Sequence, residues 1–344
     1  MKRPARLVLL VLCAILWAAA TEGAVRAFWR LRHGVPFRDP GRVLYAYYPE
    51  MIQVDMVHPD HGDGSYDILL LGGSALHDGY GAVAQVLKEQ LAAHGRHNVR
   101  IFNLAMPAHT SRDSWLKYSH LDARFDLVVV YHGINEARAN NVPPELFRDD
   151  YSHYAWYEEV NALAPYDGKA RFALPYTLRY LLIRTRHLLR RDGYVPIDAP
   201  RDDWVQYGSD PRSAACFERN LSALLDLAQS RGDQVLLMTY ATYVPEDYSL
   251  ESFRMKRLDY TLHLRPIELW GKREHVLSTV ARHNEVARRL AARSGNVLFV
   301  DQERLMPGSA RYFNDPCHLT VIGSQTFVEN LLPVLLPRLD PALE

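Results

Sequence analysis

Two sets of reactive side chains stand far apart in the sequence and could form one site. Ser74 follows the short apolar run 67–71 and two glycines. Asp315 stands three residues before His318, near the C-terminus. A carboxylate at this spacing can hold the imidazole Nδ1–H, which leaves Nε2 to act as general base toward a serine hydroxyl. Alone, the first motif is typical of an ordinary turn and the second of a helix cap.

Two more segments could supply hydrogen-bond donors to the same site. The loop 103–111 follows a second apolar run and opens a predicted helix, so its backbone N–H groups point into the site. Asn135 follows a third apolar run, and its amide could donate to an oxyanion, although a loop or helix-cap role is the simpler alternative. A nucleophile, a base with its orienting carboxylate, and two kinds of donor together favour acyl transfer through a serine.

The elements that must position these residues alternate between strands and helices. Short runs rich in Val, Leu and Ile are typical of strands buried on both faces, and helical spacing separates them. This alternation predicts an α/β fold, with a parallel sheet and helices on both faces, and places ligands beyond the carboxyl ends of the strands. The predicted strands are 67–71, 99–103, 126–131, 234–239 and 296–300. The predicted helices are 82–93, 111–121, 213–230, 274–293 and 321–335.

Two segments interrupt the alternation, at 140–212 and at 243–271. The first is rich in aromatic residues and contains a basic amphipathic helix at 176–191. We expect both segments to lie over the carboxyl edge of the sheet as a cap. The basic helix is either a solvated face packed on the core or a contact for a membrane surface or an anionic substrate.

The N-terminus has the features of a targeting segment. Three basic residues within the first six precede the unbroken apolar run 7–20, which indicates a secretory signal or a signal anchor. Small residues at 18–20 offer a cleavage site, whereas helix-compatible sequence with arginines and Trp29 beyond the run favours an uncleaved anchor. We expect an anchor that places the rest of the chain in the periplasm or outside the cell. Secretion after cleavage is the alternative.

The predicted organisation has three parts. These are the signal segment at 1–34, an N-terminal extension at 35–65 and a catalytic domain at 66–338 with its two insertions.

Composition excludes several other classes of protein. The chain has 40 basic and 40 acidic residues among 344, and this balance argues against a nucleic-acid partner. Three cysteines are too few for a disulfide framework, although one bridge between Cys216 and Cys317 stays open. The histidines and aspartates at 58–63 resemble a metal cluster, but their spacing does not suit one and no further ligand set is apparent. We therefore expect no metal site.

The four motifs taken together resemble the SGNH (GDSL) hydrolase superfamily over about residues 66–337. The resemblance implies a three-layer α/β/α fold with a flavodoxin-like sheet of about five parallel strands. It implies cleavage or transfer of acyl esters without a metal or organic cofactor. Ser74 would be the nucleophile, His318 the base and Asp315 its orienting group. The oxyanion would be held by the N–H groups of Ser74 and Ala108 and by the side chain of Asn135.

Two departures from the family pattern bear on this expectation. The glycine pair before Ser74 has Gly73 where the family name implies aspartate, and the loop 103–111 has Ala105 and Ala108 where glycines are usual. If the second loop requires a positive φ at Ala108, alanine would disfavour it.

Three functions remain open from the sequence. The first is an esterase, acting on O-acyl, plausibly acetyl, groups of a cell-surface or secreted polysaccharide, or on a lipid. The second is an acyltransferase that uses the same triad, and the third is an inactive binding protein that keeps the fold.

Overall fold

The computed structural model describes residues 3–62, 64–189, 199–295 and 297–339, and the chain divides into two compact units. Unit 1 combines Met1–Ile52 with Ser152–Tyr194. Unit 2 combines Gln53–Tyr151 with Val195–Glu344 and contains the sheet.

Unit 2 is built on a five-stranded parallel sheet in the order β2-β1-β3-β4-β5. The central strands are buried on both faces, which explains why they appear in the sequence as unbroken apolar runs rather than alternating patterns. The predicted strands are confirmed to within one residue, apart from residue 296, which lies outside the described residues. The strands are β1 (Tyr66–Gly72), β2 (Val99–Asn103), β3 (Leu127–Tyr131), β4 (Gln234–Met238) and β5 (Val297–Val300).

The strand order determines where a ligand can enter. The chain leaves β1 toward β2 on one side, and then returns past β1 to β3 on the other. This reversal leaves a crevice beyond the carboxyl ends of β1 and β3. Ser74 follows β1 and Asn135 follows β3, so the two side chains emerge at that crevice.

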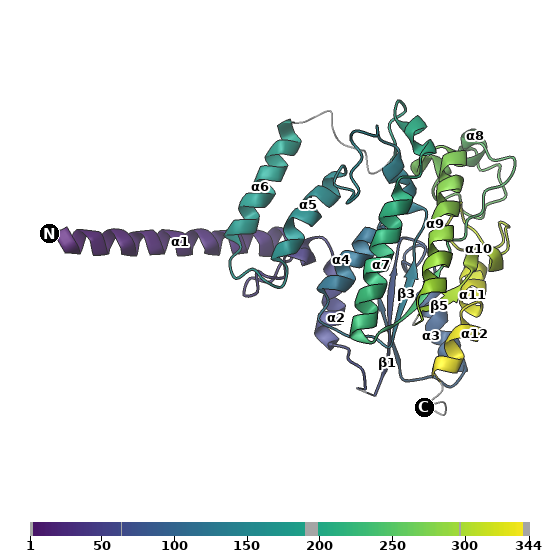
Figure 1. Ribbon diagram of the computed structural model, residues 1–344, viewed down its shortest axis with the longest axis horizontal. Helices are drawn as coiled ribbons and strands as arrows, with labels where there is room; N and C mark the ends of the chain where they lie inside the picture. The colour runs from purple at the N-terminus through teal and green to yellow at the C-terminus, as the bar shows by residue number, and fades with distance from the viewer. Residues whose placement is uncertain (1–2, 63, 190–198, 296, 340–344) are drawn as a thin grey trace. The chain divides into compact units, whose positions relative to one another are not determined.

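Helices cover both faces of the sheet, which confirms the expected three-layer α/β/α fold (Figure 1). On one face α4, α7 and α9 pack side by side, and on the other α3 packs against α11. These helices are α3 (Val83–Ala93), α4 (Ser111–His120), α7 (Ser213–Arg231), α9 (Arg273–Arg293) and α11 (Val321–Glu329).

The last predicted helix, at 321–335, is wrong as a single element. The structure ends α11 at Glu329 and starts a separate helix, α12, at Leu332. Pro333 lies in the first turn of α12. Its missing N–H and its ring are incompatible with an uninterrupted helix at this point.

Unit 1 contains the N-terminal helix and most of the first insertion. Helix α1 (Arg3–His33) runs without a break through the candidate cleavage site. Its stretch Arg6–His33 is long and apolar enough to cross a membrane, with a mean hydropathy of 2.1 over an 18-residue window, although a signal sequence has the same properties. Of the first insertion, the described residues 152–189 belong to this unit, and the expected position of this segment over the sheet stays a prediction.

The predicted basic helix corresponds to α6 (Leu174–Leu189), and its expected continuation to 191 lies outside the described residues. The other short helices of unit 1 are η1 (Val43–Ala46), η2 (Pro49–Met51), α5 (Ala155–Leu163) and η4 (Ala164–Tyr166). The remaining short elements are α2 (Ile52–Val57), η3 (Asn135–Asn140), η5 (Val205–Ser209), α8 (Leu250–Arg254), η6 (Ile267–Leu269), α10 (Gln302–Leu305), α12 (Leu332–Leu335) and η7 (Leu336–Leu339).

Candidate active site

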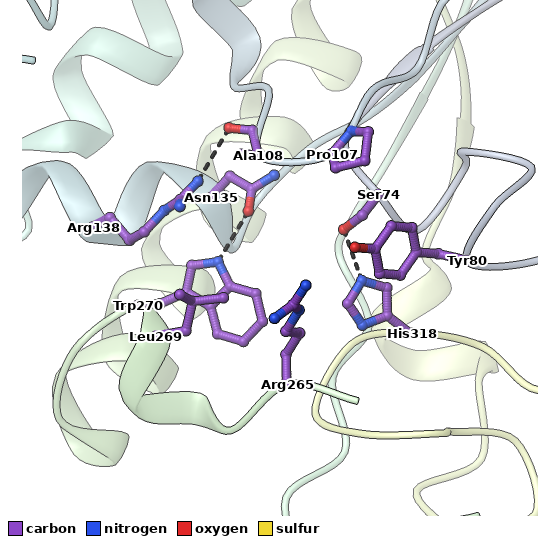
Figure 2. Close-up of a pocket in the computed structure, with 10 residues that line it drawn as sticks. All are labelled: Ser74, Tyr80, Pro107, Ala108, Asn135, Arg138, Arg265, Leu269, Trp270 and His318. Carbon is purple, nitrogen blue, oxygen red and sulfur yellow. Dashed lines mark hydrogen bonds between the residues drawn. The ribbon is translucent and has the colours of Figure 1, made fainter. Parts of the chain in front are cut away.

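The structure brings Ser74, His318 and Asp315 into one hydrogen-bonded chain. Ser74 Oγ lies 2.8 Å from His318 Nε2, as Figure 2 shows, and His318 Nδ1 lies 2.6 Å from Asp315 Oδ2. All three side chains are buried, with Ser74 8 % exposed at the mouth of the site. Because both ring nitrogens are engaged, the imidazole is oriented with Nε2 toward the serine hydroxyl.

The loop after β5 is folded around the Asp315 carboxylate. Asp315 Oδ1 accepts the backbone N–H groups of Cys317 and His318, each at 2.9 Å. Asp315 Oδ2 accepts the backbone N–H of Arg265 at 3.0 Å, in addition to the imidazole. Four N–H donors therefore converge on two oxygens, and only an ionised carboxylate can accept all of them. This arrangement fixes the histidine tautomer that carries its proton on Nδ1.

The turn that presents Ser74 is braced from the second strand. Asn103, the last residue of β2, donates from Nδ2 to the Leu76 carbonyl at 2.9 Å and to Asp78 Oδ1 at 2.9 Å. Its Oδ1 accepts the Ala105 N–H at 3.1 Å. One side chain thus ties the serine turn to the loop 103–111.

Asn135 lies across the pocket from His318 with its amide held at both ends (Figure 2). Trp270 Nε1 donates to Asn135 Oδ1 at 2.9 Å, and Asn135 Nδ2 donates to the His109 carbonyl at 2.8 Å. Because the oxygen must face the indole N–H, the NH₂ group faces the serine side of the pocket. One of its two N–H bonds is used by His109, and the other is available to a developing oxyanion.

The departure at Gly73 has a steric explanation. A Cβ at this position would lie 2.6 Å from Asn135 Nδ2 and 3.4 Å from the His109 carbonyl. In this chain, any side chain at position 73 would therefore displace the Asn135 amide from its two hydrogen bonds.

Ala108 adopts the left-handed conformation, with φ of +68°. Alanine disfavours a positive φ, but the hydrogen bonds of this loop hold Ala108 in that conformation. Arg138, which is 7 % exposed, donates to the Ala108 carbonyl at 3.1 Å, and the Asn135 amide holds the next carbonyl along the loop. With its carbonyl held in this way, the Ala108 peptide has the backbone conformation that a glycine would adopt without strain.

These groups surround a pocket of about 300 Å³ in unit 2. Sequence reasoning missed most of its walls, because they come from loops without periodicity. Tyr80 stacks on the His318 ring, with centroids 4.6 Å apart and planes at 23°. Arg265 reaches in between Trp270 and His318 (Figure 2), and none of the described Asp or Glu residues lines the pocket. The lining residues are Ser74, Tyr80, Pro107, Ala108, Asn135, Arg138, Arg265, Leu269, Trp270 and His318.

Two buried titratable groups lie behind the oxyanion side. Burial lowers the pKa of His109 to about 3, so this imidazole is neutral and adds no charge there. Burial raises the pKa of Glu136 to about 7, even though its Oε1 accepts the Ser111 N–H at 2.5 Å. Its other oxygen has no hydrogen-bond partner among the described residues. Glu136 therefore braces the start of α4 rather than facing the pocket.

Metal ligation competes poorly with these contacts. Among the described residues, one group has metal-ligand types close together, with the ligand atoms of Asp315, Cys317 and His318 within 4.8 Å of one another. However, both nitrogens of His318 are already engaged by Asp315 and Ser74.

Cys317 and Cys216 are free buried thiols, so the bridge between them is not formed. Burial raises the pKa of Cys317 well above its usual range, which keeps the thiol protonated.

Of the candidate metal segment at 58–63, residues 58–62 lie at the amino ends of the strands, and residue 63 lies outside the described residues. There His61 Nε2 lies 3.1 Å from Asp233 Oδ1, and its Nδ1 lies 3.5 Å from Asp126 Oδ1. Asp126 and Asp233 stand directly before β3 and β4, at the edge opposite Ser74. The interactions of His61 in the structure are hydrogen bonds to carboxylates.

No protein-family model matches the chain, and no curated protein does. Solved structures that match it include an acetyl xylan esterase, AlAXEase, at 14 % identity and a TM-score of 0.43, over 78 % of this chain and 99 % of that one. A lipase/acylhydrolase from Enterococcus faecalis matches at 17 % identity and a TM-score of 0.42, over 80 % and 98 %. A variant of Axe2, an acetyl xylan esterase from Geobacillus stearothermophilus, matches at 16 % identity and a TM-score of 0.41, over 78 % and 94 %. The chain is thus similar to solved acylhydrolases and acetyl xylan esterases, the class that its sequence motifs resemble.

Proposed function

We propose that the chain is a serine esterase of the SGNH type, with Ser74, His318 and Asp315 as its catalytic triad. The observation that carries this proposal is the chain of hydrogen bonds from Ser74 Oγ through His318 to Asp315, at the mouth of a pocket with Asn135 opposite. Neither the hydroxyl nor the imidazole needs to rotate before proton transfer, because their heavy atoms already lie within hydrogen-bond distance.

The proposed reaction has two balanced halves. Ser74 Oγ attacks the ester carbonyl carbon while its proton passes to His318 Nε2. The tetrahedral intermediate then collapses, the alcohol leaves with that proton, and an acyl-serine remains. Water attacks the acyl-serine as His318 again accepts a proton. Collapse of the second intermediate releases the carboxylic acid and returns the proton to Ser74.

Three donors would hold the oxyanion in both intermediates. They are the backbone N–H groups of Ser74 and Ala108 and the free N–H of the Asn135 amide. Each donates to charge that develops only in the transition state, and removing one such donor typically costs about 3 kcal/mol.

The pocket favours a small acyl group and a polar alcohol portion. Its volume of about 300 Å³ is at the lower end for ligand sites. Arg138 and Arg265 line it without any carboxylate, so it favours groups rich in hydroxyl or negatively charged oxygens. We infer an acetyl ester on a cell-surface or secreted polysaccharide as the substrate. Transfer of the acyl group to a sugar hydroxyl is the alternative, because water and alcohol compete for the same acyl-serine.

The proposed location follows from α1. An uncleaved α1 would anchor the chain in a membrane, with the sheet unit on the periplasmic or outer side. The intact mass of the purified chain measures this directly, since cleavage after Ala20 would remove the first 20 residues.

The test is active-site labelling of the full chain in detergent with a fluorophosphonate probe. We expect labelling of the wild type and loss of labelling in Ser74→Ala and in His318→Ala. Ser230→Ala is the matched control, because that serine is exposed on α7 and bonds only to its own helix. A folded wild type that is not labelled would overturn the proposal in favour of a binding protein.

A second measurement separates hydrolysis from transfer. The chain is incubated with an O-acetylated xylo-oligosaccharide, the kind of ester that an acetyl xylan esterase cleaves, with and without a large excess of an unacetylated sugar acceptor. Release of free acetate in both mixtures supports the esterase. Acetylation of the acceptor at the expense of free acetate supports the transferase.

A further inference from the structure

Helix α6 has two opposite apolar faces, and only one of them is covered. The inner face carries Tyr176, Tyr180 and Ile183, all buried within unit 1. The opposite face carries leucines that are 51–80 % exposed, at helical spacing. Isolated exposed leucines are ordinary, but a full stripe on one helix face marks a contact surface. The outer leucine face of α6 consists of Leu178, Leu181, Leu182, Leu188 and Leu189.

The inner face of α6 is joined firmly to the C-terminal part of α1. Trp29 is fully buried, and its Nε1 donates to Thr177 Oγ1 at 2.7 Å. The Trp29 ring also packs edge-on against Tyr176 and Tyr180, with centroids 5.1 and 5.2 Å apart. The two helices therefore move as one body within unit 1.

A second junction joins α1 to the start of α6. Glu22, on α1, accepts the backbone N–H groups of Ala173 and Leu174 at 2.7 and 3.0 Å. Arg26 donates to Glu22 at 2.6 Å and to the Arg171 carbonyl at 2.6 Å. The first turn of α6 is thereby held at the level of residues 22–26 of α1.

Residues 22–26 of α1 are also where this helix would leave the hydrocarbon core of a bilayer that it crosses. An α-helix rises about 1.5 Å per residue, so about 20 residues are needed to cross a hydrocarbon core of about 30 Å. Counted from Arg6, the crossing ends near Arg26, although the unbroken apolar run is only 7–20. The junction with α6 therefore falls at the headgroup boundary.

The direction of α6 agrees with this depth. In Figure 1, α6 starts beside α1 and rises obliquely away from it, with α5 on one side and the projecting apolar half of α1 on the other. The start of α6 therefore lies nearest to a bilayer that α1 would cross. Its face away from α5 is the one that can meet the acyl chains.

Two of the three arginines beside the outer leucine face are paired within unit 1, counted over the described residues of α6. Arg184 pairs with Glu159 at 3.0 Å, and Arg186 pairs with Glu158 at 2.6 Å. Arg179 is exposed at the edge of the face. Apolar burial, rather than attraction to anionic lipids, is therefore the main contribution that this surface offers.

We propose that α6 is an interfacial helix that buries its outer leucine face in the phospholipid bilayer crossed by α1. The occupant of this face is the acyl-chain boundary of that same bilayer. The helix would hold unit 1 against the membrane surface, in addition to the anchor that α1 supplies. This inference concerns unit 1 and does not depend on the proposed esterase activity.

The test measures whether α6 touches lipid in the full chain. Leu182→Cys is introduced into a Cys13→Ala background, labelled with a polarity-sensitive fluorophore and reconstituted into phosphatidylcholine vesicles. We expect emission at shorter wavelength than in a water-exposed control, and loss of most of the intensity when doxyl-labelled lipids are included. Glu251→Cys, on exposed α8, is the matched control and should show neither effect.

Changes of salt and lipid, and cross-linking between copies of the chain, distinguish an apolar lipid contact from the alternatives. Replacement of 0.05 M by 0.5 M salt, or of neutral by anionic lipid, should change the quenching little, because the contact is mainly apolar. Lipid-independent emission together with cross-linking between Leu182→Cys copies would show that a second chain covers this face, and would overturn the proposal. Water-like emission without quenching would overturn it as well. Unchanged far-ultraviolet circular dichroism of Leu182→Cys shows that unit 1 has folded.

Discussion

The two sides of the pocket are built in different ways. On one side, Asp315 and His318 lie on a single loop, and the carboxylate that orients the imidazole also accepts two backbone N–H groups of that loop. On the other side, the Asn135 amide is held by Trp270 from a distant insertion and by the carbonyl of His109. The proposed base is thus positioned locally, whereas the proposed oxyanion donors depend on contacts between three separate segments.

Substitutions on the two sides of the pocket should therefore reduce the rate in different ways. Changes on the triad side remove a chemical step, so they act on the rate directly. Changes on the oxyanion side can act through neighbours that touch no substrate. We therefore expect large effects for the first kind and graded effects for the second.

The largest effect is expected for Asp315→Asn. All four hydrogen bonds to the Asp315 carboxylate come from N–H donors. In the asparagine variant the side-chain NH₂ group must face at least one of these donors, and two donors cannot form a hydrogen bond. If the amide nitrogen faces His318, the imidazole must carry its proton on Nε2 and cannot accept one from Ser74. We expect kcat for p-nitrophenyl acetate to fall about 10⁴-fold.

Asp233→Asn is the control for this change. Asp233 is also a buried carboxylate, but it lies at the amino edge of the sheet. The folded fraction of the Asp233→Asn variant should keep near-normal kcat even if the variant is less stable than the wild type. A loss below tenfold in Asp315→Asn would show that Asp315 does not determine the tautomer.

Asn135→Ala comes next in size. It removes one donor that acts only on the oxyanion, so kcat should fall about 10²–10³-fold while KM changes little. Steady-state kinetics with p-nitrophenyl acetate measure both constants. An equal rise in KM with an unchanged kcat would instead place Asn135 in ground-state binding.

Trp270→Phe should have a smaller effect, and only through Asn135. Phenylalanine keeps an aromatic ring in place but removes the indole N–H that fixes the amide oxygen. One neutral hydrogen bond is worth about 1 kcal/mol, so kcat should fall about fivefold. In an Asn135→Ala background the same change should have no further effect on kcat. Independent losses in the double variant would contradict the positioning role.

How much of this could be predicted from the sequence differs between the two sides. The strands were predictable because buried parallel strands are short apolar runs, and the residues after them follow from the topology. Ser74, Asn135 and the Asp315–His318 pair were identified for that reason. Trp270, Arg265 and Tyr80 were missed because they lie in loops, where neither a period of 2 nor one of 3.6 applies.

Unit 1 shows a second limit. The sequence indicated that the aromatic residues of this insertion are buried, but not that several of them pack around Trp29 and its neighbours. Hydrophobic residues indicate that a segment is buried without indicating its partner. The partner became visible only through specific contacts, such as the Trp29 to Thr177 hydrogen bond.

Glu136 behind the oxyanion side should affect stability rather than rate. Burial raises its pKa in the folded state to about 7, above the ordinary value of 4.5. The folded state then binds the proton more tightly than the unfolded state, so stability falls as pH rises from about 4.5 through 7 and stays lower above that. Glu136→Gln should therefore raise Tm at pH 8 relative to the wild type by more than it does at pH 5. An equal shift at both pH values would show that the carboxyl is not the titrating group.

Ala108→Gly should be the smallest change of all. Alanine in the left-handed region costs about 1–2 kcal/mol, whereas glycine adopts it freely but loses about 0.5–1 kcal/mol more in chain entropy on folding. These terms nearly cancel, so Tm should stay the same or rise slightly, and kcat should be unchanged or higher. Ala108→Val is the contrasting variant, because a β-branched residue resists a positive φ and should misdirect the N–H donor. If glycine caused a large loss of kcat while valine was tolerated, the loop would not be holding a glycine-like conformation, and Ala108 would have no part in the oxyanion site.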